Sequence, residues 1–384
     1  MARALAVGAT VWLLAAAPPA HVATSDYFGG AAGTHLVDPS DAARWLTWAE
    51  TDIADSERLR GTNVKTLLYT DPNRAMNRQP EGKADESAFA HDCAGGRVEA
   101  YRAGQYLMDP HSQALLAVWR AHVQRYGRAG QFNAVFEDDA DDLAYLRGMP
   151  CHYSPEDWLQ ATIAMQQAVG YPIVYNGLSN FSDQTVSPAI GLNATAIGGM
   201  MEQCYARSPA RPKTMGDHWL VTEDTELRMA AVGKLFFCYG NDTTPATSAL
   251  DGRLYVYASF LLGYDPSSSV LWEYYQGPSR FHVMPETQLV PLQPLTTPRS
   301  VADLRTASGV YQRAYGTCYL AGRLQGPCVV AVNPDAQPHR LNLANYTRTL
   351  QISGGGVLDG GTVRVAPPGA PGTLGALSAI IAFK

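Results

Sequence analysis

The chain has 384 residues, of which 46% are hydrophobic and 17% charged, and its 29 basic and 35 acidic side chains give a formal net charge of −6. This apolar composition excludes a disordered chain. The absence of a lysine or arginine run excludes a nucleic-acid partner, because phosphate binding needs a concentrated basic footprint.

The first 23 residues have the pattern of an export signal. Arg3 supplies a positive charge ahead of Ala4–Ala17, an apolar stretch too short to span a bilayer comfortably. We therefore expect residues 1–23 to be removed, which gives a secreted or periplasmic protein without a membrane partner. Neither Ala20 nor Ala23 has a small residue two positions before it, so the cleavage point stays open. A retained anchor is the alternative.

Eight short apolar runs alternate with helix-like stretches over residues 24–298. Ser112–Tyr126 and Pro155–Val169 carry apolar residues at three- and four-residue spacing, and Ser154 before Pro155 is typical of a helix start. Eight strand–helix units close naturally into a barrel, so residues 24–298 are predicted to form a (βα)₈ TIM barrel. The predicted strands are Thr34–Val37, Val64–Tyr69, Gln105–Met108, Phe132–Phe136, Pro172–Tyr175, Ala194–Met201, Lys234–Tyr239 and Leu254–Leu262.

Nucleotide chemistry finds no support among these units. The sequence has no G-x-G-x-x-G between a strand and a helix and no G-K-[ST] phosphate loop. We therefore expect no cofactor.

The residue pattern changes after about Pro298, where short β-rich runs are broken by Gly and Pro. This pattern is typical of a small antiparallel β-sandwich, which we assign to residues 299–384. We expect it to pack on the barrel without supplying catalytic groups. The predicted strands lie in Gly309–Leu320, Pro327–Val332, Thr347–Ile352 and Ala376–Phe383.

Six cysteines without a C-x-x-C pair, behind an export signal, favour disulfides over a zinc or redox site. We predict Cys318–Cys328 across a hairpin and Cys204–Cys238 between the ends of consecutive barrel strands. The third predicted pair, Cys93–Cys151, joins two loops at the barrel mouth. Free buried thiols are the alternative.

Polar residues follow nearly every predicted barrel strand, at the end where such barrels carry their active sites. Carboxylates and amides beside tyrosines suit a polyhydroxylated ligand, so we expect a carbohydrate partner. Trp272, with the tyrosines after it, is interpreted either as a sugar-stacking wall or as the start of a packed helix. The predicted sugar contacts are Tyr69, Asp71, Asp109, Asn176, Tyr239, Asp265 and Trp272, and Tyr175 is expected to help line the cleft.

Cleavage of a glycosidic bond needs two carboxyl groups, one protonated and one ionised. Asp138 and Glu202, after the fourth and sixth predicted strands, are the predicted pair. Asp138 is assigned as general acid and Glu202 as nucleophile or as the base that activates water. Period-two alternation puts Asp138 on the face of Phe136 and Glu137 on the opposite face. Asp139 becomes the acid if the strand ends one residue earlier.

Structural roles are the alternatives for these residues. The acidic run 137–142 also suits a Ca²⁺ site or a helix cap. Glu202 also suits a salt bridge within the barrel. His35 and His111 are isolated in the sequence, and a metal site needs several convergent ligands, so we predict no metal for them.

Three stretches carry a family resemblance: Phe132–Asp139, Gly198–Glu202 and the turn Asn333-Pro334. With them the chain, from about residue 33 to residue 384, resembles the glycoside-hydrolase-like TIM-barrel group of secreted proteins, which is similar to the endo-α-1,4-polygalactosaminidase type. The resemblance implies that Asp138 and Glu202 match the acidic positions of that group. This chain departs from it in having Asn133-Ala134 where such proteins tend to have Asp-Gly.

The leading hypothesis is therefore hydrolysis or transfer of a glycosidic bond in an extracellular polysaccharide. A carbohydrate-binding barrel without a working carboxyl pair is the first alternative, and a separation of about 5 to 10 Å between the two carboxyl groups would favour catalysis over it. A metal-dependent hydrolase is the second, and it needs inward-facing His or further carboxylates beside the acidic run. The sugar, the linkage and the oligomeric state stay open.

Overall fold

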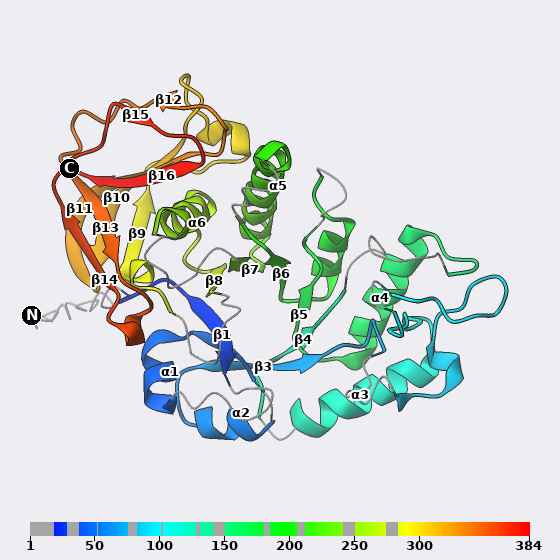
Figure 1. The fold of residues 1–384 in the computed structure, drawn as a ribbon. Coiled ribbons are helices and arrows are strands. Elements are labelled where there is room, and N and C mark those ends of the chain that lie inside the picture. The colour runs from blue at the N-terminus through cyan, green and yellow to red at the C-terminus, as the bar shows by residue number, and fades with distance from the viewer. Residues whose placement is uncertain are drawn as a thin grey trace, which may run out of the picture.

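The computed structural model describes residues 19–28, 38–51, 53–75, 83–100, 103–127, 131–140, 150–179, 185–205, 212–240 and 250–273, and residues 283–384. Eight parallel strands pair in chain order and close on themselves, since β1 pairs with both β2 and β8 (Figure 1). The predicted TIM barrel is confirmed. Its strands are β1 Thr24–Phe28, β2 Trp48–Thr51, β3 Lys65–Thr70, β4 Ala134–Glu137, β5 Ile173–Asn176, β6 Gly198–Glu202, β7 Leu235–Gly240 and β8 Ser269–Glu273.

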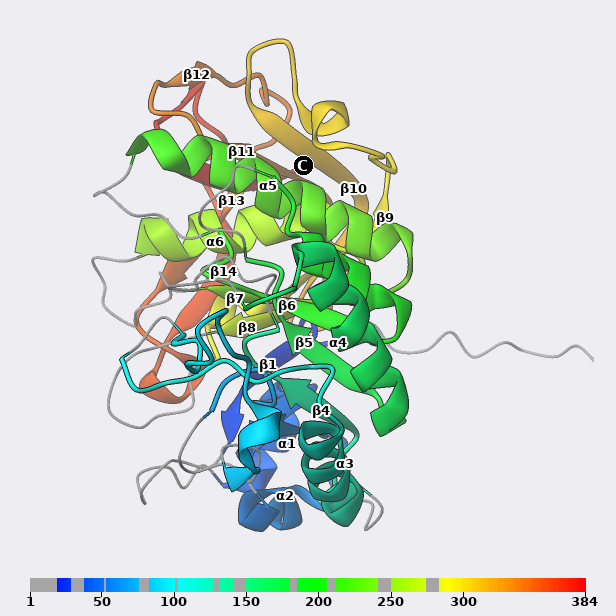
Figure 2. The same cartoon turned by 90° about the vertical axis from the view of Figure 1, so that its right-hand side faces the viewer.

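Helices lie outside the ring of strands (Figures 1 and 2). The predicted segments 112–126 and 155–169 are confirmed as α3 and α4. Ser154 caps α4 in a capping box with Asp157, which satisfies free backbone N–H groups at the helix start. The helices are α1 Pro39–Trp45, α2 Ile53–Leu59, α3 Gln113–Gly127, α4 Pro155–Val169, α5 Pro212–Ala231 and α6 Leu250–Gly263, with the 3₁₀ turns η2 Glu86–Ala88 and η3 Pro188–Ala194.

The predicted eighth strand, Leu254–Leu262, is wrong, because these residues belong to α6. Every residue from Tyr255 to Gly263 is buried, since α6 lies between the barrel and the C-terminal sheet (Figures 1 and 2). A helix covered on all sides is apolar on all sides, so its sequence has no amphipathic period to separate it from a buried strand.

The predicted strand Gln105–Met108 is also wrong as a barrel strand. Its residues form antiparallel bridges to Arg74 and Phe89 within an insertion between β3 and α3. The predicted strand Thr34–Val37 lies outside the described residues. The barrel instead uses β1, β2 and β8, whose four or five residues each include polar ones.

The C-terminal region forms antiparallel sheets. One sheet has the order β14-β13-β16-β11-β10-β9, and β12 pairs with β15 in a second. The four β-rich runs predicted there are confirmed as β10, β11, β13 and β16, and β9 adds a strand ahead of Pro298. The strands are β9 Leu289–Pro294, β10 Tyr311–Leu320, β11 Arg323–Asn333, β12 His339–Arg340, β13 Arg348–Ser353, β14 Thr362–Ala366, β15 Thr373–Leu374 and β16 Ser378–Phe383, with the 3₁₀ turns η5 Pro285–Gln288, η6 Val301–Leu304 and η7 Val357–Asp359.

All three predicted disulfides are confirmed. Cys93–Cys151, Cys204–Cys238 and Cys318–Cys328 have Cα separations of 4.8, 5.3 and 6.0 Å, which lie within the usual range for the bond. Disulfides of this number are typical of proteins folded in an oxidising compartment.

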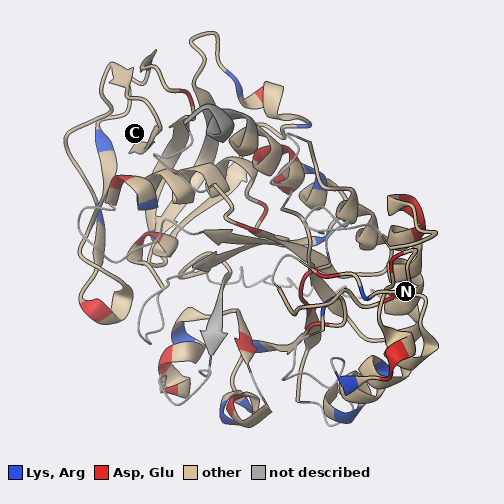
Figure 3. Ribbon diagram, turned by 45° about the vertical axis from the view of Figure 1, so that its right-hand side comes forward, with Lys and Arg blue, Asp and Glu red and all other residues tan. Residues whose placement is uncertain are grey.

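Charged residues are spread over the described part of the chain. Figure 3 shows Lys and Arg placed singly or beside Asp and Glu, without a continuous basic stripe. Among the helices of the described ranges, none combines the length and the apolarity of a membrane-crossing segment.

Candidate active site

Asp138 and Glu202 lie together at the C-terminal end of the barrel, and Asn176 joins them. Asn176 ends β5, between the two strands that carry the acids. Its Nδ2 donates to Asp138 Oδ1 and to Glu202 Oε1, each at 2.8 Å, so these two oxygens are at most 5.6 Å apart. The structure therefore brings both predicted acids and one predicted sugar contact into a single hydrogen-bonded group.

Three donors converge on the Asp138 carboxyl group. Besides Asn176, the Tyr69 hydroxyl donates to Oδ2 at 2.6 Å, and the backbone N–H of Asp139 donates to Oδ1 at 2.9 Å. Burial, together with the charges of Asp138 and Asp71, raises the pKa of Tyr69 far above its ordinary value, so this phenol stays protonated and donates.

Glu137 faces away from this group, as strand alternation predicts. Phe136 lies in the barrel interior, whereas Glu137 is fully buried against α4, where Gln166 Nε2 donates to its Oε2 at 2.5 Å. Asn73 Nδ2 donates to Glu137 Oε1 at 3.2 Å and to the Asp138 carbonyl oxygen at 2.8 Å. Burial raises the pKa of Glu137 to about 7.

A second acidic layer lies beside Asp138. Asp71 is buried, and its Oδ1 accepts from the backbone N–H of Arg74 at 2.9 Å. The Arg74 guanidinium contacts Asp139 Oδ1 at 2.7 Å. Burial and the neighbouring charges of Asp139 and Asp138 raise the pKa of Asp71 well above its ordinary value. Because Asp71 is fully buried, it has no exposed surface for a ligand in this structure, and its role as a sugar contact stays a prediction.

The carboxyl oxygens of Asp71, Asp138 and Asp139 lie within 4.8 Å of one another, which is close enough for a shared metal ion. Both oxygens of Asp138 already accept hydrogen bonds, and Arg74 already places a positive charge on Asp139. Protein donors thus satisfy both oxygens of Asp138 and one oxygen of Asp139, whereas the buried Oδ2 of Asp71 has no hydrogen-bond partner among the described residues. The metal-dependent alternative stays a hypothesis beside the carboxyl pair.

Two further predicted sugar contacts, Asp109 and Tyr239, have contacts other than Asp138 and Glu202. Asp109 lies on the insertion after β3, where both of its carboxyl oxygens accept from the Tyr153 hydroxyl at 2.8 Å and the His111 ring stacks on Tyr153 at 4.9 Å. Tyr239 is 7% exposed and faces the barrel interior. Their roles as sugar contacts stay predictions.

Trp272, Asp265 and Tyr175 do not stand where the sequence pattern put them. Trp272 is a fully buried residue within β8, and its ring packs against Phe136 and Tyr239, each at 5.6 Å, so it fills the barrel interior instead of forming a stacking wall or starting a helix.

Asp265 precedes β8, at the opposite end of the barrel, because α6 occupies the residues predicted as the eighth strand. Its Oδ1 accepts from the Ser267 backbone N–H at 2.8 Å in a turn. Tyr175 faces outward into the helix layer.

Sequence reasoning missed two charged residues near the site. Glu50 is the third of the four residues of β2, a strand that was not predicted, and its charge acts on Tyr69. Its position two residues after the interior Trp48 is the signal that identifies it once β2 is known. Arg74 follows Asp71 by three residues, but its ion pair with Asp139 crosses between two loops and has no local sequence signal.

No family model and no curated protein sequence matches the chain. Solved structures similar to it include Ega3 from Aspergillus fumigatus in complex with galactosamine, at 13% identity and a TM-score of 0.42 over 69% of this chain and 96% of that one. A GH27 β-L-arabinopyranosidase from Geobacillus stearothermophilus has 9% identity and a TM-score of 0.47 over 94% and 96% of the two chains. The maltogenic α-amylase AmyB from Thermotoga neapolitana has 9% identity and a TM-score of 0.48 over 94% and 98%.

Proposed function

We propose that this protein is an exported glycoside hydrolase in which Asp138 and Glu202 cleave a glycosidic bond of a polysaccharide. The observation that carries the proposal is the pair itself: two half-buried carboxyl groups at the barrel mouth, bridged by one amide of Asn176. Acid/base cleavage of a glycosidic bond requires two such groups on either side of the bond.

The short separation favours retention of the anomeric configuration. Retaining enzymes hold their carboxyl groups about 5 to 5.5 Å apart, whereas inverting enzymes leave about 6.5 to 9.5 Å for a water molecule. The limit of 5.6 Å between Asp138 Oδ1 and Glu202 Oε1 suits the first group. In this mechanism one acid attacks the sugar directly.

The roles that we propose for the two acids are the reverse of the sequence-based expectation. The three donors that contact its carboxyl oxygens support Asp138 as the nucleophile, and Glu202 is then the acid. An Asp138 oxygen bonds to the anomeric carbon while the glycosidic C–O bond breaks, and Glu202 gives its proton to the leaving oxygen. Water then attacks the anomeric carbon, returns a proton to Glu202 and frees the Asp138 carboxylate.

Export is part of the proposal. Three disulfides are expected where thiols are oxidised, and the expected signal over residues 1–23 leads there. Most of that signal lies outside the described residues. The expected substrate is therefore a polysaccharide met outside the cytoplasm.

The test is a screen of the purified protein against a panel of polysaccharides for new reducing ends, with Asp138→Asn and Glu202→Gln beside the parent. Each variant keeps shape and hydrogen bonding but loses the ionisable group, so activity is expected to fall by roughly 10³-fold or more while the fold persists. Asp251→Asn, on an exposed residue of α6, is the matched control and should keep parental activity.

Rescue by azide separates the two roles. Azide should restore turnover of Asp138→Gly with an inverted glycosyl azide, and of Glu202→Gly with a retained one, because the small anion replaces the missing nucleophile or enters where water would. A parent that binds a polysaccharide but yields no reducing ends from any member of the panel would instead identify a carbohydrate-binding barrel.

A further inference from the structure

Directly after Glu202 the chain makes a turn with an unfavourable backbone. Gln203 and Tyr205 have φ angles of 54° and 52°. This left-handed region is unfavourable for residues other than Gly, Asn and Asp, because the Cβ atom approaches the following carbonyl oxygen too closely. Such a conformation persists only where surrounding contacts hold it, so the contacts of residues 203–205 hold the backbone directly after Glu202.

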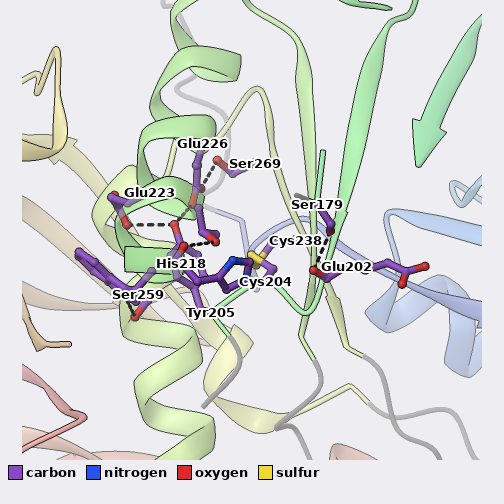
Figure 4. The surroundings of a disulfide bond; sticks show 12 residues. Ser179, Glu202, Cys204, Tyr205, His218, Glu223, Glu226, Cys238, Ser259 and Ser269 are labelled. Atoms are coloured by element: carbon purple, nitrogen blue, oxygen red, sulfur yellow. Dashed lines mark hydrogen bonds between the residues drawn. A yellow bond between two sulfur atoms is a disulfide. The ribbon is translucent and has the colours of Figure 1, made fainter. Parts of the chain in front are cut away.

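Several contacts hold this turn against β7 and α5 (Figure 4). The Cys204 N–H donates to the Tyr239 carbonyl oxygen at 2.9 Å, and the Cys204–Cys238 disulfide ties the same residue to β7. His218 of α5 hydrogen-bonds the backbone of Gln203. On the other side, the Ser179 hydroxyl donates to the Glu202 carbonyl oxygen at 2.9 Å.

Tyr205 makes the deepest of these contacts. Its ring is 1% exposed, and its hydroxyl lies 2.9 Å from Glu223 Oε2 and 2.8 Å from Glu226 Oε2, both on α5 (Figure 4). Ser269 of β8 donates to Glu226 Oε1 at 2.9 Å. A phenol has one proton and cannot donate fully to two carboxylates, so the group is held best when one glutamate carries a proton and donates to the Tyr205 oxygen.

The surroundings favour that shared proton. Burial and mutual repulsion raise the pKa of Glu223 well above its ordinary value, and burial raises that of Glu226 as well. Arg313 of β10 supplies the opposing positive charge, while its Nη1 donates to the carbonyl oxygens of Leu262 and Tyr264 at 2.8 and 3.0 Å. The other titratable groups that face the pair are Tyr264 after α6 and Tyr311 and Tyr315 of β10.

We propose that Tyr205, held by the buried carboxyl pair Glu223 and Glu226, is a positioning residue for Glu202. The inference rests on the proposed function, in which Glu202 is the proton donor. Loss of the hydroxyl anchor lets the turn relax out of its left-handed conformation, and this rotates Glu202 away from Asn176 and Asp138. Because Arg313 belongs to the C-terminal sheet, that domain contributes to the support of the acid although it touches no substrate.

The test compares Tyr205→Phe with Tyr257→Phe. Tyr257 is a matched control, since it is also 1% exposed and its hydroxyl donates to the backbone of Leu289, away from the turn. Crystal structures of parent and variants report the contact between Asn176 Nδ2 and Glu202 Oε1. We expect the contact to be lost in Tyr205→Phe and kept in Tyr257→Phe, with a similar fall in Tm for both.

Kinetics on aryl glycosides with graded leaving groups supply a readout that a merely structural role would not move. An acid is needed only when the leaving group is poor. Tyr205→Phe should lower kcat/KM roughly 10- to 100-fold on poor leaving groups and leave dinitrophenyl glycosides within about threefold. Equal losses on both classes, or a Tyr205→Phe enzyme that behaves like Tyr257→Phe, would overturn the proposal.

Two further arms keep the outcome decisive. If Tyr205→Phe does not fold, Glu223→Ala with Glu226→Ala removes both partners of the phenol while alanine preserves the helix, and the same loss of the Asn176–Glu202 contact is expected. If Glu202→Gln keeps parental turnover, the proposed function fails. The crystallographic arm still decides the positioning role, because a Glu202 that stays bonded to Asn176 without the Tyr205 anchor refutes it.

Discussion

Asn176 is the residue that bridges the proposed carboxyl pair. Replacing it by alanine removes a donor from both acids, and hydrogen bonds to charged groups contribute about 1.5–3 kcal/mol. We expect Asn176→Ala to lower kcat roughly 10- to 100-fold while the fold is kept. Asn193→Ala, which removes an amide that pairs with Tyr175 in the helix layer, is the control. Equal activity of the two variants, measured by release of reducing ends, would show that the bridge has no catalytic role.

Two residues of the candidate site, Asp138 and Glu202, could be selected from the sequence because their positions obey local rules. Alternation along β4 separates Asp138 from Glu137, and the end of β6 identifies Glu202. Asp265 was misplaced because the strand before it is a helix. Trp272 was misread because aromatic residues fill barrel interiors as readily as they stack on sugars. The contacts that hold the turn after Glu202 join elements that lie far apart in the sequence, so no spacing of residues reveals them.

At the scale of elements, strands with long apolar runs were predictable and short polar ones were not. β3, β4, β5, β6 and β7 match predicted runs. β1 and β2 have five and four residues and contain acidic side chains, so they lack the signal of a buried strand. α6 produced the opposite error, since it is apolar all round. The count of eight units was right, although two of them, Gln105–Met108 and Leu254–Leu262, were wrongly placed.

The start of the barrel constrains where the expected export signal can be cut. Val22 is fully buried, its N–H donates to the Thr287 carbonyl oxygen at 2.9 Å, and the Ala23 carbonyl oxygen accepts from Leu271. Cleavage after Ala23 would remove these contacts, whereas cleavage after Ala20 keeps them. We predict that N-terminal sequencing of the exported protein begins at His21. A protein that begins at Thr24 and has the same Tm as one begun at His21 would contradict this reading.

For the whole molecule, buried carboxyl groups set the dependence of stability on pH. The pKa values of Glu137, Glu223 and Glu226 are raised in the folded protein, to about 7 for Glu137. These groups therefore lose their protons at a lower pH in the unfolded chain than in the folded protein. Their contribution to the free energy of unfolding is complete below about pH 4.5 and is lost as the pH rises toward 8. Ionisation of Glu137 alone lowers the free energy of unfolding by roughly 3 kcal/mol.

Scanning calorimetry between pH 5 and pH 8 checks this dependence. We expect the Tm of the parent to fall by several degrees across the range. The Tm of Glu137→Gln should fall less over the same range. Because Glu137 faces α4 and not the mouth, the same variant should keep kcat within about threefold. A Tm that rises with pH over this range would mean that the buried carboxyl groups are stabilised as anions in the folded protein.

The central claim is that Asp138 attacks the sugar while Glu202 supplies the proton, and covalent trapping tests it most directly. The protein is incubated with a 2-deoxy-2-fluoro glycosyl fluoride of the sugar identified by the polysaccharide screen, and its peptides are mapped by mass spectrometry. A retaining pair accumulates a glycosyl-enzyme intermediate under these conditions. We predict a single sugar on the peptide that contains Asp138, absent from Asp138→Asn. A sugar on Glu202 or on any other residue, or an inverted product without a trapped intermediate, would contradict the account.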